Sequence, residues 1–279
     1  MWKTGASCAG QKVLDRELFE AYKVAGFDMM EISLGEFNGV DASKAERIKE
    51  VFVPQKVRKL SEEAGVGLWS LHLPFGYEFS PTNPKGELLS QMIKLDSELL
   101  EMCAEAGVKI AVIHPSTEPI LDSDREEYKK LSCETLFVIN EVAKKCGVTL
   151  AVENLPRTCL GRTAEEMKLF LDIDPSIGVC FDVNHLLCQS HRDFVKSVGD
   201  RIITTHISDY DFIDERHWVP GHGQIDWMEL VELLKEVNYQ GVFMNEVEAK
   251  TDRQHKPDVL TYKELHDANM AIFEKYYNK

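Results

Sequence analysis

The sequence predicts an α/β fold: a single barrel in which eight parallel strands alternate with helices. Eight short apolar runs are separated by segments of helical periodicity, which is the alternation expected for a parallel sheet. Six consecutive runs end in an acidic residue or a histidine. Because the strands of a parallel barrel all point the same way, residues at their ends converge on one rim. We therefore expect a (β/α)8 barrel with its active site at the C-terminal rim of the strands.

The predicted strands are short, and each is followed by a turn or loop. They lie near residues 3–8, 27–34, 66–73, 108–114, 148–154, 177–183, 201–207 and 241–247. The last six carry, at or near their ends, His72, His114, Glu153, Asp182, His206 and Glu246. Side chains of these types bind metal ions or transfer protons. A set of them at one rim predicts a catalytic centre.

Helical periodicity is clearest in residues 85–106 and 124–146, where large apolar residues recur every three or four positions. Three strands are each preceded by a glycine, and these are Gly65, Gly107 and Gly147. A glycine there can adopt the left-handed conformation that ends a helix. Gly, Pro, Asn and Asp in 35–47, 74–86, 115–123 and 208–225 predict loops over the barrel mouth.

Composition favours one domain over residues 1–279 and restricts its partners. The chain is 44% hydrophobic and has no Pro/Gly/Ser-rich linker, so it can bury one sizeable core. Its net charge of −15, without a basic cluster, disfavours nucleic acid as a partner. Seven dispersed cysteines, no apolar leader and no long apolar stretch favour a cytoplasmic protein with reduced thiols that does not enter a membrane. Whether it forms a homo-oligomer stays open.

Glu153, Asp182, His206 and Glu246 end four consecutive predicted strands and could surround one point. Three carboxylates and one imidazole suit Mn²⁺, Mg²⁺ or Co²⁺ better than a structural Zn²⁺. Each residue alone could simply pair with a neighbour, but four ionisable groups in one cavity without a cation would repel one another and lose hydration. We expect one divalent cation, with Mn²⁺ favoured and Mg²⁺, Co²⁺ or Zn²⁺ as alternatives.

Several short motifs together resemble a known family. They are AVEN (151–154), FDVNH (181–185), THISD (205–209), RHWVPGHGQIDW (216–227) and NEVE (245–248). They are similar to motifs of the xylose isomerase-like TIM-barrel superfamily, which contains sugar isomerases, ketose epimerases, inosose dehydratases and nucleases of the endonuclease IV type. The resemblance extends over nearly the whole chain.

The resemblance implies a metal-dependent isomerase or epimerase of a small sugar or sugar derivative. In the sugar enzymes, the residues matching the four predicted ligands hold one divalent cation, which stabilises an enediolate. Glu153 and Glu246 are the expected acid-base pair, one on each face of the sugar. Residues matching His185 and Arg216 contact substrate oxygens. A lyase or dehydratase of a keto-sugar or inosose could use the same centre, and a metal-free sugar-binding barrel is a third class.

The nuclease branch is a further alternative, because its three-metal ligand list also maps onto this sequence. The positions that match the first metal site are His72, His114 and Glu153, and those that match the second are Glu153, Asp182, His206 and Glu246. The positions that match the third metal site are His185, Glu215 and His217. Glu215 stands where that family has Asp, and the acidic charge disfavours DNA.

Several residues therefore have two possible roles. His72 and His114 are expected to line the sugar pocket in preference to holding a second cation. Glu31 and Trp218 are additional candidates for sugar contact, through a carboxylate and an aromatic face respectively.

Overall fold

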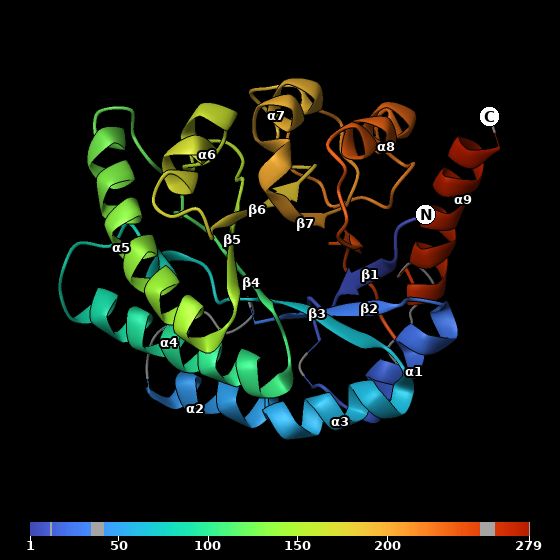
Figure 1. Ribbon diagram of the computed structural model, residues 1–279, viewed down its shortest axis with the longest axis horizontal. Coiled ribbons are helices and arrows are strands. Elements are labelled where there is room, and N and C mark those ends of the chain that lie inside the picture. Colours follow the sequence, from blue (N-terminus) through green and yellow to red (C-terminus); the bar gives the residue numbers. More distant parts are fainter. Residues whose placement is uncertain (12, 35–41, 252–259, 279) are drawn as a thin grey trace.

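In the computed structural model, which describes residues 1–11, 13–34, 42–251 and 260–278, eight parallel strands form a nearly closed barrel with helices packed around it (Figure 1). The strands are β1 (Thr4–Ser7), β2 (Met29–Ser33), β3 (Gly67–His72), β4 (Ile110–Ile113), β5 (Thr149–Glu153), β6 (Gly178–Asp182), β7 (Ile202–His206) and β8 (Phe243–Asn245). Each of these strands lies within its predicted range, so the predicted barrel is confirmed.

The helices follow the strands in the expected alternation. They are α1 (Arg16–Ala25), α2 (Ala42–Val51), α3 (Pro54–Ala64), α4 (Glu87–Ala106), α5 (Arg125–Cys146), α6 (Ala164–Leu171), α7 (His191–Val198), α8 (Trp227–Glu236) and α9 (Tyr262–Tyr277), with short 3₁₀ turns at Tyr77–Phe79 and Gly199–Arg201. No helix in the described residues is both long enough and apolar enough to cross a lipid bilayer.

Neighbouring strands pair in parallel in the order β7, β6, β5, β4, β3, β2, β1, β8. The barrel closes between β7 and β8 through residues just beyond their ends. Ile207 N donates to Met244 O at 2.8 Å, and Glu246 N donates to Ile207 O at 3.1 Å. The two ends of the sheet therefore meet at the C-terminal rim, beside Glu246.

The two predicted helices are found, and the three predicted glycine caps end α3, α4 and α5. Helices α4 and α5 occupy 87–106 and 125–146, and Gly65, Gly107 and Gly147 have φ of 75°, 84° and 67°. The loop expected over 35–47 is only partly testable, since 35–41 lie outside the described residues. Its second part is wrong, because helix α2 begins at Ala42.

The barrel interior has an apolar layer beneath the polar rim. Ala151 and Cys180 are buried inside, two residues before Glu153 and Asp182, and pack with Ile110 and Val112. Alternate residues of a strand share a face, so the acidic residues point into the barrel one layer higher. The side chains at the rim therefore stand on a packed floor.

A buried ion pair fastens the loop after β5 to helix α5. Arg125 contacts Glu166 through Nε at 2.6 Å and Nη2 at 2.7 Å, and their side chains are 7% and 10% exposed. Arg125 also donates to the carbonyls of Thr158 and Cys159, both at 2.8 Å. Burial raises the pKa of Glu166, but the hydrogen bonds and charge of Arg125 outweigh it and hold that pKa below its usual value. This pair orders a loop that borders the barrel mouth.

Replacing Arg125 with alanine should lower the free energy of unfolding by about 3 kcal/mol, because Glu166 would stay buried with only Lys129, at 3.6 Å, as an ionic partner. Urea unfolding followed by circular dichroism measures the loss. The control is Arg58→Ala, which breaks an exposed ion pair with Glu62 and should have little effect. Similar losses in both variants would contradict a special role for the buried pair.

Candidate metal centre and active site

The four predicted ligands come together at the C-terminal rim. Glu153, Asp182 and His206 are the last residues of β5, β6 and β7, and Glu246 directly follows β8. One ligand atom from each of the four lies within 4.8 Å of the others. The first three side chains are fully buried, and that of Glu246 is 18% exposed. The convergence expected from a parallel barrel is therefore present in the geometry.

The atoms that face this point lack hydrogen-bond partners. Glu153 Oε1, Asp182 Oδ2, His206 Nδ1 and Glu246 Oε2 are buried and unsatisfied. His206 Nδ1 lies 3.3 Å from both Glu153 Oε1 and Glu246 Oε2. A buried polar atom without a hydrogen-bond partner is costly, and four such atoms that converge are suited to ligating a cation. Three carboxylate oxygens and one imidazole nitrogen fit a divalent cation.

The charges at this point are in conflict. Burial, together with the nearby carboxylates of Glu246 and Glu153, raises the pKa of Asp182 to about 7 even though His185 opposes the shift. Burial also acts to raise the pKa of Glu153 and of Glu246, but the charge of His206 and its neighbours outweighs burial and lowers both. A cation placed among the carboxylates would relieve the repulsion.

Two asparagines orient Asp182. Asp182 N donates to Asn154 Oδ1 at 2.9 Å, and Asn154 Nδ2 donates to Asp182 O at 2.8 Å. Asp182 Oδ1 accepts from Asn184 N at 2.6 Å and His185 N at 3.2 Å, so only Oδ2 faces the centre. The sequence analysis gave these asparagines no role. The available signal was an asparagine one or two residues after each acid.

His72 and His114 both face the second oxygen of Glu153. Their Nε2 atoms lie 3.1 and 3.3 Å from Glu153 Oε2. The ring of Phe75 stacks on His114 with centroids 4.5 Å apart and meets His72 edge-on at 5.2 Å. The pair forms a wall beside Glu153, and the three residues offer one ligand atom each within 4.8 Å of one another. Both expected roles fit this geometry.

A third cluster lies on the opposite side of His185. His217 Nε2 is 3.0 Å from Glu215 Oε1, and His185 Nε2 is 4.0 Å from the same oxygen. The hydrogen bond from His217, with the charges of His185 and Arg157, lowers the pKa of Glu215 to about 2 despite burial. Arg157 Nη1 holds the other oxygen, Glu215 Oε2, at 2.9 Å.

Arg157 joins loops that follow three different strands. Besides Glu215 it contacts Asp214 through Nε at 2.7 Å and Glu118 through Nη1 at 3.0 Å. It has a left-handed backbone with φ of 51°, an unusual conformation for a side chain of this size. Nothing in the sequence indicates that Arg157 joins these loops, because its partners are distant in sequence. The contacts indicate that it ties the loops at the mouth together.

The segment with Arg216 and Trp218 lies at the outer rim. Arg216 Nε donates to Asp211 Oδ2 at 3.0 Å, and its guanidinium lies 5.9 Å from the Trp218 ring centre. Trp218 is 40% exposed. Both side chains are therefore accessible to solvent.

Asp209 shapes the loop that presents these residues. Its fully buried carboxylate accepts from Tyr210 N, Gly221 N, Ile225 N and the indole Nε1 of Trp227, at 2.8 to 3.2 Å. Gly221 has φ of 93°, and a Cβ on Gly223 would lie 2.3 Å from Asp209 Oδ1. Both glycines are thus required by the turn around one buried carboxylate.

Glu31 lies behind His206. It is fully buried, its two oxygens are 3.1 and 3.2 Å from His206 Nε2, and Ser70 Oγ donates to it at 2.7 Å. From the sequence, Glu31 is a candidate for sugar contact, with an ordinary ion pair as an equal alternative. In the structure its partners are Ser70 and His206, on the far side of the imidazole from the ligand cluster.

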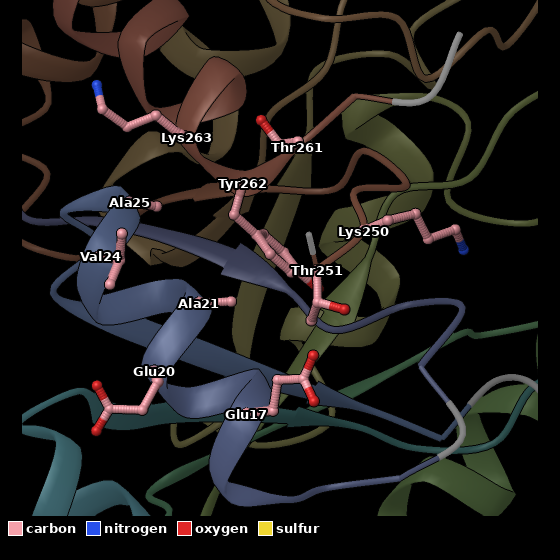
Figure 2. A pocket seen from close by; sticks show the side chains of 10 residues that line it. All are labelled: Glu17, Glu20, Ala21, Val24, Ala25, Lys250, Thr251, Thr261, Tyr262 and Lys263. Atoms are coloured by element: carbon pink, nitrogen blue, oxygen red, sulfur yellow. The ribbon is translucent and has the colours of Figure 1, made fainter. Parts of the chain in front are cut away.

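A separate surface pocket lies outside the barrel, between α1 and the start of α9 (Figure 2). None of the predicted site residues lines it. Figure 2 shows the charged ends of Glu20, Lys250 and Lys263 extending away from one another. Binding sites for small molecules usually have polar groups that converge, so the barrel mouth is the better candidate.

Comparison with known proteins agrees with this architecture. Residues 19–268 match the family described as xylose isomerase-like TIM barrel. The chain is 23% identical over 248 residues to a D-psicose 3-epimerase of Enterocloster bolteae, covering 83% of this chain and 78% of the relative. It is 28% identical over 216 residues to an inosose isomerase of Bacillus velezensis, covering 72% and 74%. The crystal structure of the IolI protein with a bound zinc atom superposes with a TM-score of 0.76, at 20% identity and covering 99% and 100% of the two chains.

Asp182→Asn should weaken binding of Mn²⁺ and Zn²⁺ because it removes a charged ligand from the cluster. Loss of a residue that only hydrogen-bonds to a ligand typically costs roughly 10- to 100-fold in metal affinity, and we expect a larger loss here. Titration calorimetry on chelator-stripped protein measures the affinity. The control is Asp267→Asn on α9, which disturbs only an exposed pair with Lys263 and should bind as the wild type does. If Asp182→Asn retained wild-type affinity, the proposed cation position would be wrong.

Proposed function

The chain belongs to the xylose isomerase-like TIM-barrel family, and we propose that it is a divalent-cation-dependent isomerase or epimerase of a small sugar or sugar derivative. The observation that carries the proposal is that four buried atoms without hydrogen-bond partners, each able to ligate a metal ion, converge from four strand ends at the barrel mouth. The names of the two curated relatives, an epimerase and an isomerase, support an enzyme of the same type.

The cation would be held by Glu153, Asp182, His206 and Glu246, with Mn²⁺ favoured by the oxygen-rich set. When bound, it supplies Lewis-acid stabilisation for negative charge that develops on the substrate's oxygens. Glu153 and Glu246 form the acid-base pair: the ionised member takes a proton from carbon, and the other member, in its protonated form, donates a proton to the opposite face. The lowered pKa of each carboxyl favours the ionised form that acts as the base.

The substrate's remaining oxygens would meet His185, Arg216 and the wall formed by His72 and His114. His185 is oriented by donation from Nδ1 to Asn154 O at 2.9 Å. Trp218 and Phe75 offer aromatic faces that suit the C–H face of a sugar. Screening free and phosphorylated ketoses and inososes with Mn²⁺, followed by product NMR, tests the proposal.

Glu153→Gln and Glu246→Gln should each lower turnover at least about 10²-fold, because each removes a proton-transfer group. Each variant also loses a charged ligand of the cation. The control is Glu248→Gln, an exposed residue paired with Lys250, which should leave turnover unchanged. Steady-state kinetics with circular dichroism to verify folding is the measurement. Near wild-type turnover in either variant would refute the assignment.

His185→Ala and Arg216→Ala should lower kcat/KM by roughly 10²-fold, the effect of losing a donor worth about 3 kcal/mol in the transition state. Metal content at the four-residue centre should not change, because neither residue belongs to that cluster. Elemental analysis alongside kinetics separates the two effects. Loss of one equivalent of metal from His185→Ala would make His185 a ligand.

A lyase or dehydratase of a keto-sugar or inosose would begin with the same proton abstraction at the same centre. The products distinguish it from the leading proposal. Retention of every substrate atom supports isomerisation or epimerisation, whereas loss of water or another leaving group supports elimination.

A nuclease of the endonuclease IV type is favoured by one observation. The clusters His72, His114, Glu153 and His185, Glu215, His217 each offer three ligand atoms within 4.8 Å, beside the four-residue centre. Two features oppose it: the guanidinium of Arg157 lies 2.9 Å from Glu215, where its charge disfavours a further cation, and the net charge is −15.

We expect no incision of duplex DNA carrying an abasic site at physiological salt, because the acidic chain would repel the phosphate backbone. A gel assay with Mn²⁺ and Zn²⁺ measures it. Incision at an enzyme-like rate, with three bound metal ions per chain, would replace the sugar proposal by the nuclease.

A further inference from the structure

We propose that Glu31 is a positioning residue of the metal centre: it fixes the protonation and orientation of His206 and thereby sets how tightly the centre holds its cation. The inference rests on the proposed function in one respect, that the four-residue cluster binds a divalent cation. It adds a residue that does not itself reach the cation. Glu31 acts only through the imidazole of His206.

The geometry determines which nitrogen of His206 carries the proton. Nε2 lies 3.1 and 3.2 Å from the two oxygens of Glu31, and carboxylate oxygens accept hydrogen bonds. In a neutral imidazole, Nε2 must therefore be the donor and Nδ1 the acceptor. Nδ1 is the unsatisfied atom that lies 3.3 Å from Glu153 Oε1 and Glu246 Oε2. Its lone pair is thus directed into the ligand cluster.

The fold holds Glu31 in this position from behind. Strands β2 and β3 shift register between Met30 and Glu31, which brings Ser70 opposite Glu31. Such irregularities commonly re-aim a side chain. Ser70 Oγ donates to Glu31 Oε2 at 2.7 Å, and both residues are fully buried. The carboxylate is therefore fixed before any ligand binds.

His206 differs from three other histidines at the mouth in the partner of its outer nitrogen. The Nδ1 atoms of His72, His185 and His217 donate to the backbone carbonyls of Leu73, Asn154 and Glu246, at 2.8, 2.9 and 3.1 Å, and His185 Nδ1 also lies 3.3 Å from Glu153 Oε1. His206 instead donates to a carboxylate. A charged acceptor makes the stronger hydrogen bond and raises the basicity of the opposite nitrogen. This hydrogen bond should therefore strengthen His206 Nδ1 as a ligand of the four-residue centre.

The test is metal affinity of the full chain after removal of bound metal with a chelator. Glu31→Gln should bind Mn²⁺ and Zn²⁺ roughly 10- to 100-fold more weakly than the wild type, with unchanged stoichiometry. The matched control is Glu118→Gln, a rim carboxylate that contacts Arg157 and none of the four ligands, and it should bind normally. Glu31→Asp keeps the charge and should recover part of the affinity.

A spectroscopic readout separates positioning from a general effect on the fold. In the Zn²⁺-loaded wild type, ¹H–¹⁵N NMR of the histidine side chains should show a slowly exchanging Nε2 proton shifted far downfield by Glu31. This resonance should move upfield or disappear in Glu31→Gln, whereas it should persist in Glu118→Gln. Circular dichroism establishes that each variant is folded.

If Glu31→Gln does not fold, Ser70→Ala provides the test, because it removes only the hydrogen bond that holds Glu31. A several-fold loss of Mn²⁺ affinity in that variant supports the proposal, and unchanged affinity overturns it. For a folded Glu31→Gln, wild-type affinity together with an unmoved Nε2 resonance overturns it. A wild-type chain that binds neither Mn²⁺ nor Zn²⁺ overturns the proposed function as well, so the two failures are distinguishable.

Discussion

The repulsion among three carboxylates buried at one end of the barrel is the constraint on which the rest of the site depends. Glu153, Asp182 and Glu246 each direct one unsatisfied oxygen to the same point, where His206 lies between them and His185 Nδ1 is 3.3 Å from Glu153 Oε1. In a medium of low dielectric constant such charges cannot coexist without compensation. Histidines on one side and a bound cation on the other are the two compensations that the geometry allows.

The surrounding residues prevent the carboxylates from relaxing into hydrogen bonds with one another. The backbone amides of Asn184 and His185 donate to one carboxylate oxygen of Asp182, while His72 and His114 face one oxygen of Glu153. The remaining carboxylate oxygen of each side chain points to the centre. Such preorganisation keeps a binding site ready at the cost of local electrostatic strain.

The loops over the barrel mouth are organised by charges of their own. Arg157 forms ion pairs with Glu118, Asp214 and Glu215. Asp209 accepts hydrogen bonds from uncharged N–H donors at the base of the loop that carries Arg216. The buried pair of Arg125 and Glu166 anchors the loop on which Arg157 stands. A rigid rim built this way can hold hydrogen-bond donors over a small substrate.

The barrel fold could be predicted from the sequence alone, because apolar runs that alternate with helical periodicity indicate which residues are buried. Parallel strands must also end at one rim. The sequence also identified the residue types at four strand ends. Only the tertiary structure decided which oxygen or nitrogen of each side chain faces the centre, that Glu31 supports His206, and that Arg157 binds three loops. Those outcomes depend on strand register, on a bulge and on contacts between residues far apart in the chain, and local sequence patterns carry no information about such directions.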